Sequence, residues 1–152
     1  MKYFAKAALL LLIGLFMIAG LIACNPSGVG DEPDLDGTSW ILQQFGPAGA
    51  ETAVLPNAAL TLNFDSDQID GHAGCNSYFA EATIGKDGRV TFGMMGSTLM
   101  ACADEAMMQQ ESAFLATLAQ ANRYTVAGNQ LTLHTPDGSL TFVAATSNET
   151  SN

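Results

Sequence analysis

Three cysteines are the residues of this chain best suited to chemistry, because a thiol can be acylated, oxidised or bound to a metal. They are Cys24, which follows an apolar N-terminal stretch, and Cys75 and Cys102 in the body of the chain. The chain has no C-x-x-C motif, and neither His72 nor His134 stands at a recognised zinc-ligand spacing. The spacing therefore disfavours a thiol redox centre and a zinc site.

The residues before Cys24 have the layout of a signal peptide. A charged n-region with two lysines, a short apolar h-region and small residues precede it. Residues 21–24, Leu-Ile-Ala-Cys, also resemble the bacterial lipobox, in which the cysteine becomes the diacylated first residue of the mature protein. We therefore expect residues 1–23 to be removed as a lipoprotein signal peptide, and Cys24 to carry the lipid that holds the protein to a membrane.

Two alternatives to lipidation are weaker. The segment from Ala7 to Ala23 reaches only the lower limit for a transmembrane helix, and no basic stop-transfer cluster follows it. Ordinary secretory cleavage would leave Cys24 as a spare exposed thiol, which is prone to oxidation. Because Asn25 is not the aspartate linked to inner-membrane retention in some bacteria, the favoured location in the cell envelope is the periplasmic face of the outer membrane.

Apart from Cys24, the chain has two cysteines, and an even number of cysteines in an exported protein favours a disulfide. A bond between Cys75 and Cys102 would close a loop of about 28 residues and stabilise the fold by on the order of 3.5 kcal/mol in the chain-entropy model. Two buried reduced thiols, or a redox or metal site, are the alternatives. We expect the disulfide, and no resident metal or cofactor.

The mature chain is strongly acidic. Without residues 1–23, three basic residues (Lys86, Arg89 and Arg123) remain against all 15 Asp and Glu residues, which gives a net charge of −12. Phosphate contacts require basic residues, so we expect no nucleic-acid partner. Anionic lipid head groups would repel the domain beyond its own anchor. Four of the acids fall within residues 24–36, a flexible tether by composition, which self-repulsion would extend.

Other reactive side chains lack a supporting pattern. The acids from Asp65 onward superficially match a calcium loop, but Ile69 stands at its fifth position and Asn76 replaces the bidentate glutamate at its twelfth. No G-x-S-x-G motif marks Ser77 or any other serine as a nucleophile. We expect both histidines to be surface or hydrogen-bonded residues, and we predict no catalytic residue.

Five methionines fall in the predicted helix or just before it: Met94, Met95, Met100, Met107 and Met108. A methionine-rich surface can bind soft metals or adaptable partners. Methionine is nevertheless most often a gap-filling core residue, so we expect these side chains to fill the core.

Most of the mature chain reads as short strands, with period-2 alternation or β-forming residues between turn signals. The predicted strands are 38–45, 57–64, 69–74, 78–84, 90–92, 124–126, 131–133 and 140–143, and 94–102 is compatible with one more. Residues 104–120 are the only good helical segment, with Met107, Phe114, Leu115 and Leu118 on one face. The expected fold class is mainly β (α+β): a single antiparallel sheet or partly closed barrel of about 7–9 strands with one packed helix.

One set of motifs resembles a known family. Residues 71–79 contain a G-x-x-G-C-N core, and residues 96–102 contain S-T-x-M-A-C. Together with the opening strand at 35–40 and Glu111 in the helix, these motifs resemble the META domain family, also called HslJ-like, over about residues 35–144. The resemblance implies a small β-rich domain with a packed helix, found in bacterial envelope lipoproteins and heat-inducible proteins, without an established enzymatic activity.

The motif residues have structural explanations. Glycine at positions 71 and 74 suits a bulge or a close backbone approach, and an asparagine side chain bonds the amides of a turn. We therefore predict structural roles for the set Gly71, Gly74, Asn76, Ser97, Thr98 and Met100. The expected organisation is a signal peptide at 1–23, a tether at 24–36, the META-like domain at 37–144 and a disordered tail at 145–152.

Three functions compete on these grounds. The leading hypothesis is a non-catalytic, lipid-anchored envelope lipoprotein that supports envelope integrity or a stress response through a protein partner. The second is a carrier of a small apolar ligand in a barrel pocket. Its candidate lining residues are Trp40, Phe64, Phe79, Phe92 and Phe142. The third, an envelope hydrolase or thiol redox enzyme, would need a cleft that joins His72 or His134 to a nucleophile or a free thiol.

Overall fold

The computed structural model describes residues 33–145, so the predicted signal peptide, Cys24, most of the tether and nearly all of the C-terminal tail lie outside the described residues. This part of the chain contains ten strands and one helix. They are β1 (Ser39–Pro47), β2 (Thr52–Ala53), β3 (Thr61–Asp65), β4 (Gln68–His72), β5 (Ser77–Ile84), β6 (Val90–Phe92), β7 (Gly96–Ser97), α2 (Glu105–Leu118), β8 (Arg123–Ala127), β9 (Gln130–His134) and β10 (Gly138–Ala144).

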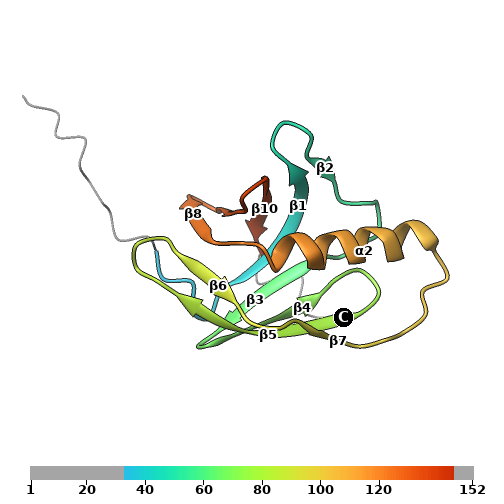
Figure 1. Ribbon diagram of the computed structural model, residues 1–152, viewed down its shortest axis with the longest axis horizontal. Coiled ribbons are helices and arrows are strands. Elements are labelled where there is room, and N and C mark those ends of the chain that lie inside the picture. Colours follow the sequence, from blue (N-terminus) through green and yellow to red (C-terminus); the bar gives the residue numbers. More distant parts are fainter. Residues whose placement is uncertain (1–32, 146–152) are drawn as a thin grey trace, which may run out of the picture. The chain divides into compact units, whose positions relative to one another are not determined.

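The strands form one antiparallel sheet that curls into a nearly closed barrel (Figure 1). Eight strands follow one path in the order β6-β5-β4-β3-β1-β10-β9-β8, while β2 pairs with β1 and β7 pairs with β5. The two ends of this path meet, because Arg89 and Arg123 form a bridge and the Tyr124 amide donates a 2.7 Å hydrogen bond to the Gly88 carbonyl. The predicted fold class is confirmed.

Most predicted strands are present within a few residues of their expected bounds, and the last three form the predicted meander. Two segments differ. β2 was not predicted, because its two exposed residues carry no apolar alternation. The segment 94–102 contains only the short strand β7, because side-chain hydrogen bonds rather than a continuous ladder hold the residues after Ser97.

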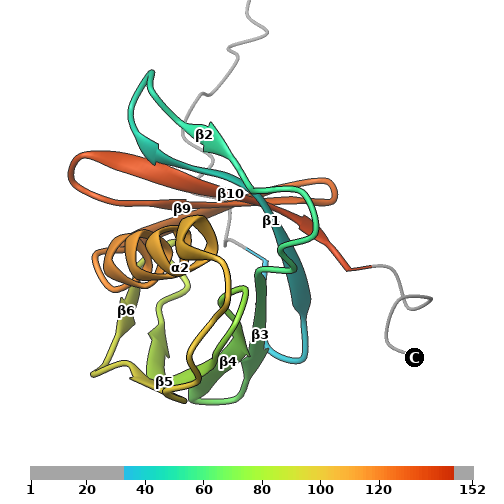
Figure 2. The same cartoon turned by 90° about the vertical axis from the view of Figure 1, so that its right-hand side faces the viewer.

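The helix α2 begins where the sequence predicted. Asp104 is its N-cap, with a carboxylate that accepts hydrogen bonds from the amides of Ala106 and Met107. Figure 2 shows α2 between the β9–β10 side of the barrel and the side formed by β3, β4 and β5. Its fully buried Phe114 makes edge-to-face contacts with Phe45 of β1 and Tyr78 of β5, at centroid distances of 6.1 and 5.6 Å. The helix therefore fills the opening between the two sides.

The prediction that the five methionines fill the core is wrong for three of them. The side chains of Met94, Met100 and Met108 are 95%, 61% and 46% exposed. The ladder is interrupted between β6 and β7, so the alternation that buries Val90 and Phe92 is lost at Met94. Within residues 33–145, no helix is long and apolar enough to cross a membrane.

Candidate functional site

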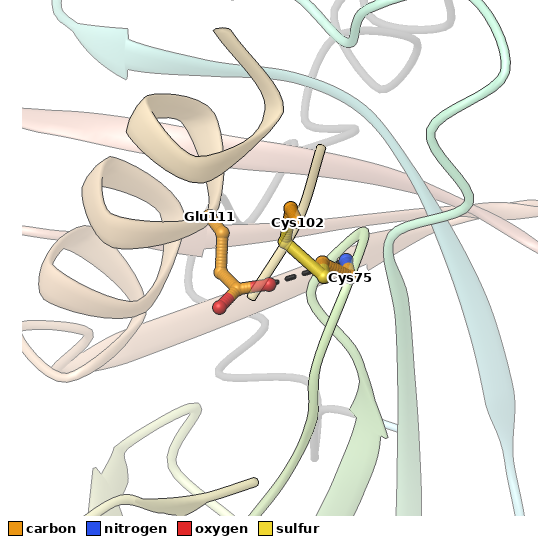
Figure 3. Close-up of side chains that lie close together, drawn as sticks. All are labelled: Cys75, Cys102 and Glu111. Atoms are coloured by element: carbon orange, nitrogen blue, oxygen red, sulfur yellow. Dashed lines mark hydrogen bonds between the residues drawn. A yellow bond between two sulfur atoms is a disulfide. The ribbon is translucent and has the colours of Figure 1, made fainter. Parts of the chain in front are cut away.

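Cys75, Cys102 and Glu111 form a cluster beside α2, with one ligand atom from each lying within 4.8 Å of the others (Figure 3). The arrangement superficially suits a metal ion. However, the structure joins Cys75 and Cys102 in a disulfide, with Cα atoms 6.0 Å apart, as the sequence favoured. Metal ligation and nucleophilic attack both require a thiolate, which a cystine sulfur does not offer. In this state the cluster provides one carboxylate and no thiol chemistry.

The Glu111 carboxylate is engaged by the backbone of the Cys75 segment (Figure 3). Its Oε2 accepts hydrogen bonds from the amides of Cys75 and Asn76, at 3.1 and 2.8 Å, and its Oε1 accepts from the Asn76 amide nitrogen Nδ2 at 2.7 Å. A carboxylate that accepts three such bonds ties the helix to the turn between β4 and β5. From the sequence, Glu111 was identified only as part of the family resemblance, and these hydrogen bonds were not predicted.

Asn76 is buried although its side chain is an amide, with 5% of it exposed. Its Oδ1 accepts hydrogen bonds from the Thr98 hydroxyl at 2.8 Å and from the Met100 amide at 2.7 Å. Together with its bond to Glu111, these contacts join the turn after β4, the loop after β7 and the helix α2. Asn76 therefore links three segments that are far apart in sequence.

The two motif cores predicted from the sequence meet directly at this point. The Thr98 hydroxyl accepts a hydrogen bond from the Ser77 amide at 3.2 Å, and the Thr98 amide donates to the Ser77 carbonyl at 3.0 Å. Ser97 pairs with Tyr78 in the β5–β7 ladder, and Met100 contributes its backbone to Asn76. The motif residues thus build a clamp, which we define as Asn76, Thr98, Glu111 and the cystine, around the loop 98–102.

The two motif glycines occupy places where a larger residue is disfavoured. A Cβ atom at Gly71 would lie 2.1 Å from the backbone oxygen of Thr61, which leaves no space for any side chain. Gly74 has a φ of +113°, and its Cβ would lie 3.3 Å from Cγ of Met107 on the helix. The backbone therefore approaches closely at Gly71, and Gly74 adopts a conformation that favours glycine.

Replacement of Gly74 by alanine is expected to lower the free energy of unfolding by about 1–2 kcal/mol, because an L-residue rarely adopts its backbone conformation. Gly93→Ala is the matched control, since a Cβ there would also lie 3.3 Å from a side-chain carbon, of Glu81, but Gly93 lacks a positive φ. That change should lower the free energy of unfolding by clearly less than the change at Gly74. Urea unfolding followed by the fluorescence of the single, buried Trp40 measures both variants. Equal losses in the two would contradict the interpretation.

The two histidines and the acids of the calcium-like segment form no catalytic arrangement among the described residues. His72 is exposed at the end of β4, and His134 on β9 has its Nε2 3.2 Å from the Thr125 hydroxyl. Neither histidine belongs to a group of three metal-ligating side chains in the described residues. The calcium-like acids behave as surface groups, with Asp70 accepting a hydrogen bond from Asn63.

Tyr78 of β5 is buried in the core, against Phe114 of the helix. Its hydroxyl donates a 2.7 Å hydrogen bond to the Thr61 carbonyl. Burial, with a smaller contribution from the charge of Asp70, raises the pKa of the Tyr78 phenol well above its usual range. The phenol therefore stays protonated and acts as a structural donor.

Most of the aromatic residues proposed to line a ligand pocket belong to the buried core of the described residues. Four of the five aromatic residues proposed to line a ligand pocket are buried in the core, whereas Phe79 is 61% exposed on the outside. A half-open depression of about 670 Å³ lies at the surface, lined by apolar side chains of β3, β5 and β8 together with charged groups. Its charged lining residues are Asp34, Asp36, Asp67 and Lys86.

Five large apolar side chains of the described residues are exposed on the outside of the domain. We call them the exposed apolar group: Phe79, Met94, Leu99, Met100 and Met108. Leu99 and Met100 line a depression of about 380 Å³ together with Glu111 and Leu115 of α2. Phe79 and Met94 line a second depression of about 400 Å³. The sequence signal for this group was the cluster of methionines, which we interpreted as core.

A sequence model of the META domain matches residues 33–147, which include every described strand and the helix. The chain belongs to the META domain family. Its clamp is therefore built from the residues by which the sequence resembled that family. No curated protein matches the chain in sequence.

Solved structures share the META domain fold. A protein from Burkholderia xenovorans, determined by NMR, is 31% identical, with a TM-score of 0.64 over 74% of this chain and 84% of that one. A second NMR structure is 21% identical, with a TM-score of 0.55 over 72% and 90%. A DUF4847 family protein from Bacteroides vulgatus is 13% identical, with a TM-score of 0.50 over 72% and 93%. The last two likenesses show a shared fold alone.

Proposed function

We propose that this META domain protein is a non-catalytic, lipid-anchored lipoprotein of the cell envelope that acts by binding another protein, in support of envelope integrity or a stress response. The observation that carries the proposal is the exposed apolar group. Side chains of this size that are 95% or more exposed, as Met94 and Leu99 are, expose apolar area to water. Exposed apolar residues that lie together, as Leu99 and Met100 do at one depression and Phe79 and Met94 at another, typically mark interaction sites.

The clamp holds part of this group in place. Leu99 lies between Thr98 and Met100, whose hydroxyl and amide both donate to Asn76, and the disulfide fixes the chain at Cys102. A loop that is already ordered loses less conformational entropy when a partner binds. The hydrogen bonds of Asn76 and the disulfide therefore hold the loop that carries Leu99 in a fixed, exposed position.

The state of the reactive side chains favours a binding role over catalysis. Both sulfurs of the clamp are in a disulfide, and the Glu111 carboxylate accepts three hydrogen bonds from the neighbouring turn. A general base or nucleophile needs a substrate within hydrogen-bonding reach. In this domain the two sulfurs are bonded to each other, and the Glu111 carboxylate is bonded to the neighbouring turn.

Lipid attachment is the first testable part of the proposal. Mass spectrometry of the protein from membranes should find Cys24 as the first residue, with fatty acyl chains attached. Each buried methylene contributes about 0.8 kcal/mol, so several chains on one residue give a stable anchor. Behind an ordinary secretory signal peptide, which does not require the lipobox for cleavage, Cys24→Ser should move the protein to the soluble envelope fraction. A soluble wild-type protein or an unmodified Cys24 would contradict the anchor.

Protein binding is tested in intact cells with a photo-crosslinking amino acid at position 99. Leu99 should give an adduct with a defined partner, because it is 96% exposed within the exposed apolar group. The same amino acid at Asn129, exposed in the turn between β8 and β9, is the control and should give no such adduct. The same adducts from both positions, or none from position 99, would count against the proposal.

A carrier of a small ligand is the second candidate, favoured by the depression of about 670 Å³ at the surface near Phe64 and Tyr124. The site that we propose for such a ligand is that surface depression. Its three aspartates and one lysine would suit a polar or cationic molecule better than the purely apolar one that we first considered.

A further inference from the structure

The depression of about 400 Å³ on the outer face of β5 combines apolar and acidic groups. Its lining includes Phe79 and Met94 from the exposed apolar group and the exposed carboxylate of Glu81. Phe79 and Glu81 are two residues apart on one strand, so their side chains share the outward face. An aromatic ring, a thioether and a carboxylate therefore border one shallow site.

A second carboxylate lies across the ladder from the ring. Asp70 of β4 pairs directly with Phe79 of β5, and both side chains are exposed on the same face of the sheet. Directly paired residues of antiparallel strands have Cβ atoms roughly 4.5–5.5 Å apart. The ring is thus flanked along its own strand by Glu81 and across the ladder by Asp70.

Basic residues of the described chain lie elsewhere. Arg89 pairs with Asp87 at 3.1 Å, and Arg123 donates to the Asp87 carbonyl at 3.3 Å, near Lys86 in the turn between β5 and β6. β4 and β5 themselves carry no lysine or arginine. No positive charge of these strands neutralises the two carboxylates beside Phe79.

The Phe79 ring rests on the neighbouring strand. A Cβ atom at Gly96, its partner in the β5–β7 ladder, would lie 2.5 Å from Cζ of the Phe79 ring. The glycine therefore leaves room for the ring to lie against the backbone of β7. A ring that is packed in this way loses little rotamer freedom when a ligand covers it.

We propose that this face, Phe79 with Met94, Glu81 and Asp70, binds arginine or lysine side chains of a partner polypeptide. The aliphatic stem packs against Phe79 and Met94, while the cationic head group lies over the ring and between the two carboxylates. Anionic lipid and nucleic acid are repelled by the same charges, and a second copy of the domain would bring like charges together. The inference rests on the proposed function, because it names the chemistry of that partner.

Two fluorescent peptides of about 12 residues serve as probes, one alternating arginine and leucine and the other alternating glutamate and leucine. Fluorescence anisotropy with the mature chain, carrying Cys24→Ser, should show binding of the arginine peptide only. The affinity should weaken as NaCl rises from about 50 to about 300 mM, because screening reduces the attraction between exposed charges.

Matched variants separate this site from the general negative charge. Glu81→Gln combined with Asp70→Asn should weaken binding of the arginine peptide by roughly tenfold, and Phe79→Ser should have a similar effect. Glu51→Gln combined with Asp137→Asn removes the same charge from other surfaces and should change the affinity by less than about twofold. Circular dichroism checks that each variant is folded. We expect each to fold, because the substituted side chains lie at the surface.

Several results would overturn the inference: binding of the glutamate peptide, an equal loss in both charge pairs, or unchanged binding by Phe79→Ser. A protein that instead binds phosphatidylglycerol vesicles through this face, or dimerises through it, would also overturn it. The two proposals fail separately. An adduct at position 99 in cells without arginine-peptide binding leaves the proposed function standing and removes this chemistry, whereas the reverse pattern removes the proposed function.

Discussion

Replacement of Asn76 by aspartate is expected to lower the free energy of unfolding by about 3 kcal/mol. The change keeps the shape of the side chain, so it creates no cavity. It removes the Nδ2 donor that lies 2.7 Å from Oε1 of Glu111 and puts a second carboxylate in its place. Because Asn76 is only 5% exposed, water does little to weaken the repulsion between the two acids.

Asn63→Asp is the matched control for this prediction. The Asn63 side chain also donates to a carboxylate, with its Nδ2 2.8 Å from Oδ1 of Asp70, but that pair is exposed. The same chemical change should therefore lower the free energy of unfolding by less than about 1 kcal/mol. Urea unfolding of the mature chain, followed by Trp40 fluorescence, gives both values. Similar losses would show that the burial of Asn76 has little energetic weight.

The strands were predictable because their signal is local. In and just before β3 the buried side chains of Leu60, Leu62 and Phe64 alternate with more exposed ones, which is the period-2 pattern that the sequence shows. The closure of the barrel was not predictable in this way. It depends on the contact between Arg89 and Arg123, which lie on segments separated by the helix and carry no pairing signal.

The helix shows the same limit. Its predicted extent followed from the absence of Gly and Pro in residues 104–120. In the structure Asp104 is the N-cap, and the helix runs from Glu105 to Leu118. Of the four residues expected on its buried face, only Phe114 and Leu118 are fully buried, while Met107 and Leu115 are half-buried. The fully buried stripe of the helix is therefore narrower than the four-residue face that the sequence predicted.

The clamp was predictable in its members but not in its connections. The motif identified Asn76 and Thr98, and counting the cysteines pointed to the disulfide. The bonds from Glu111 to the Cys75 and Asn76 amides join residues about 35 positions apart, and no periodicity reports such a contact. The exposed apolar group was missed because methionine composition alone does not distinguish a core from a surface.

Loss of the disulfide should lower the free energy of unfolding by about 3.5 kcal/mol, through the loop entropy that the bond removes from the unfolded chain. The estimate depends on the separation of 27 positions between Cys75 and Cys102. Cys75→Ser with Cys102→Ser, compared with the parent in the Cys24→Ser background, measures the loss by urea unfolding. Titration of that oxidised parent without reductant should find no free thiol, and a reactive thiol there would revive the redox alternative.

The disulfide and Asn76 hold the same loop, so their effects on stability should be coupled. Once the cystine is absent, residues 98–102 have lost a covalent attachment, and the bonds from Asn76 to Thr98 and Met100 contribute less. Asn76→Asp combined with the two serine substitutions should therefore cost less than the separate losses added together, by roughly 0.5–2 kcal/mol. Asn63→Asp in the same serine background should be additive, because Asn63 bonds to Asp70 outside the clamp. Additivity for Asn76 as well would mean that the disulfide and the hydrogen bonds stabilise the loop independently, and would contradict the clamp as a single cooperative unit.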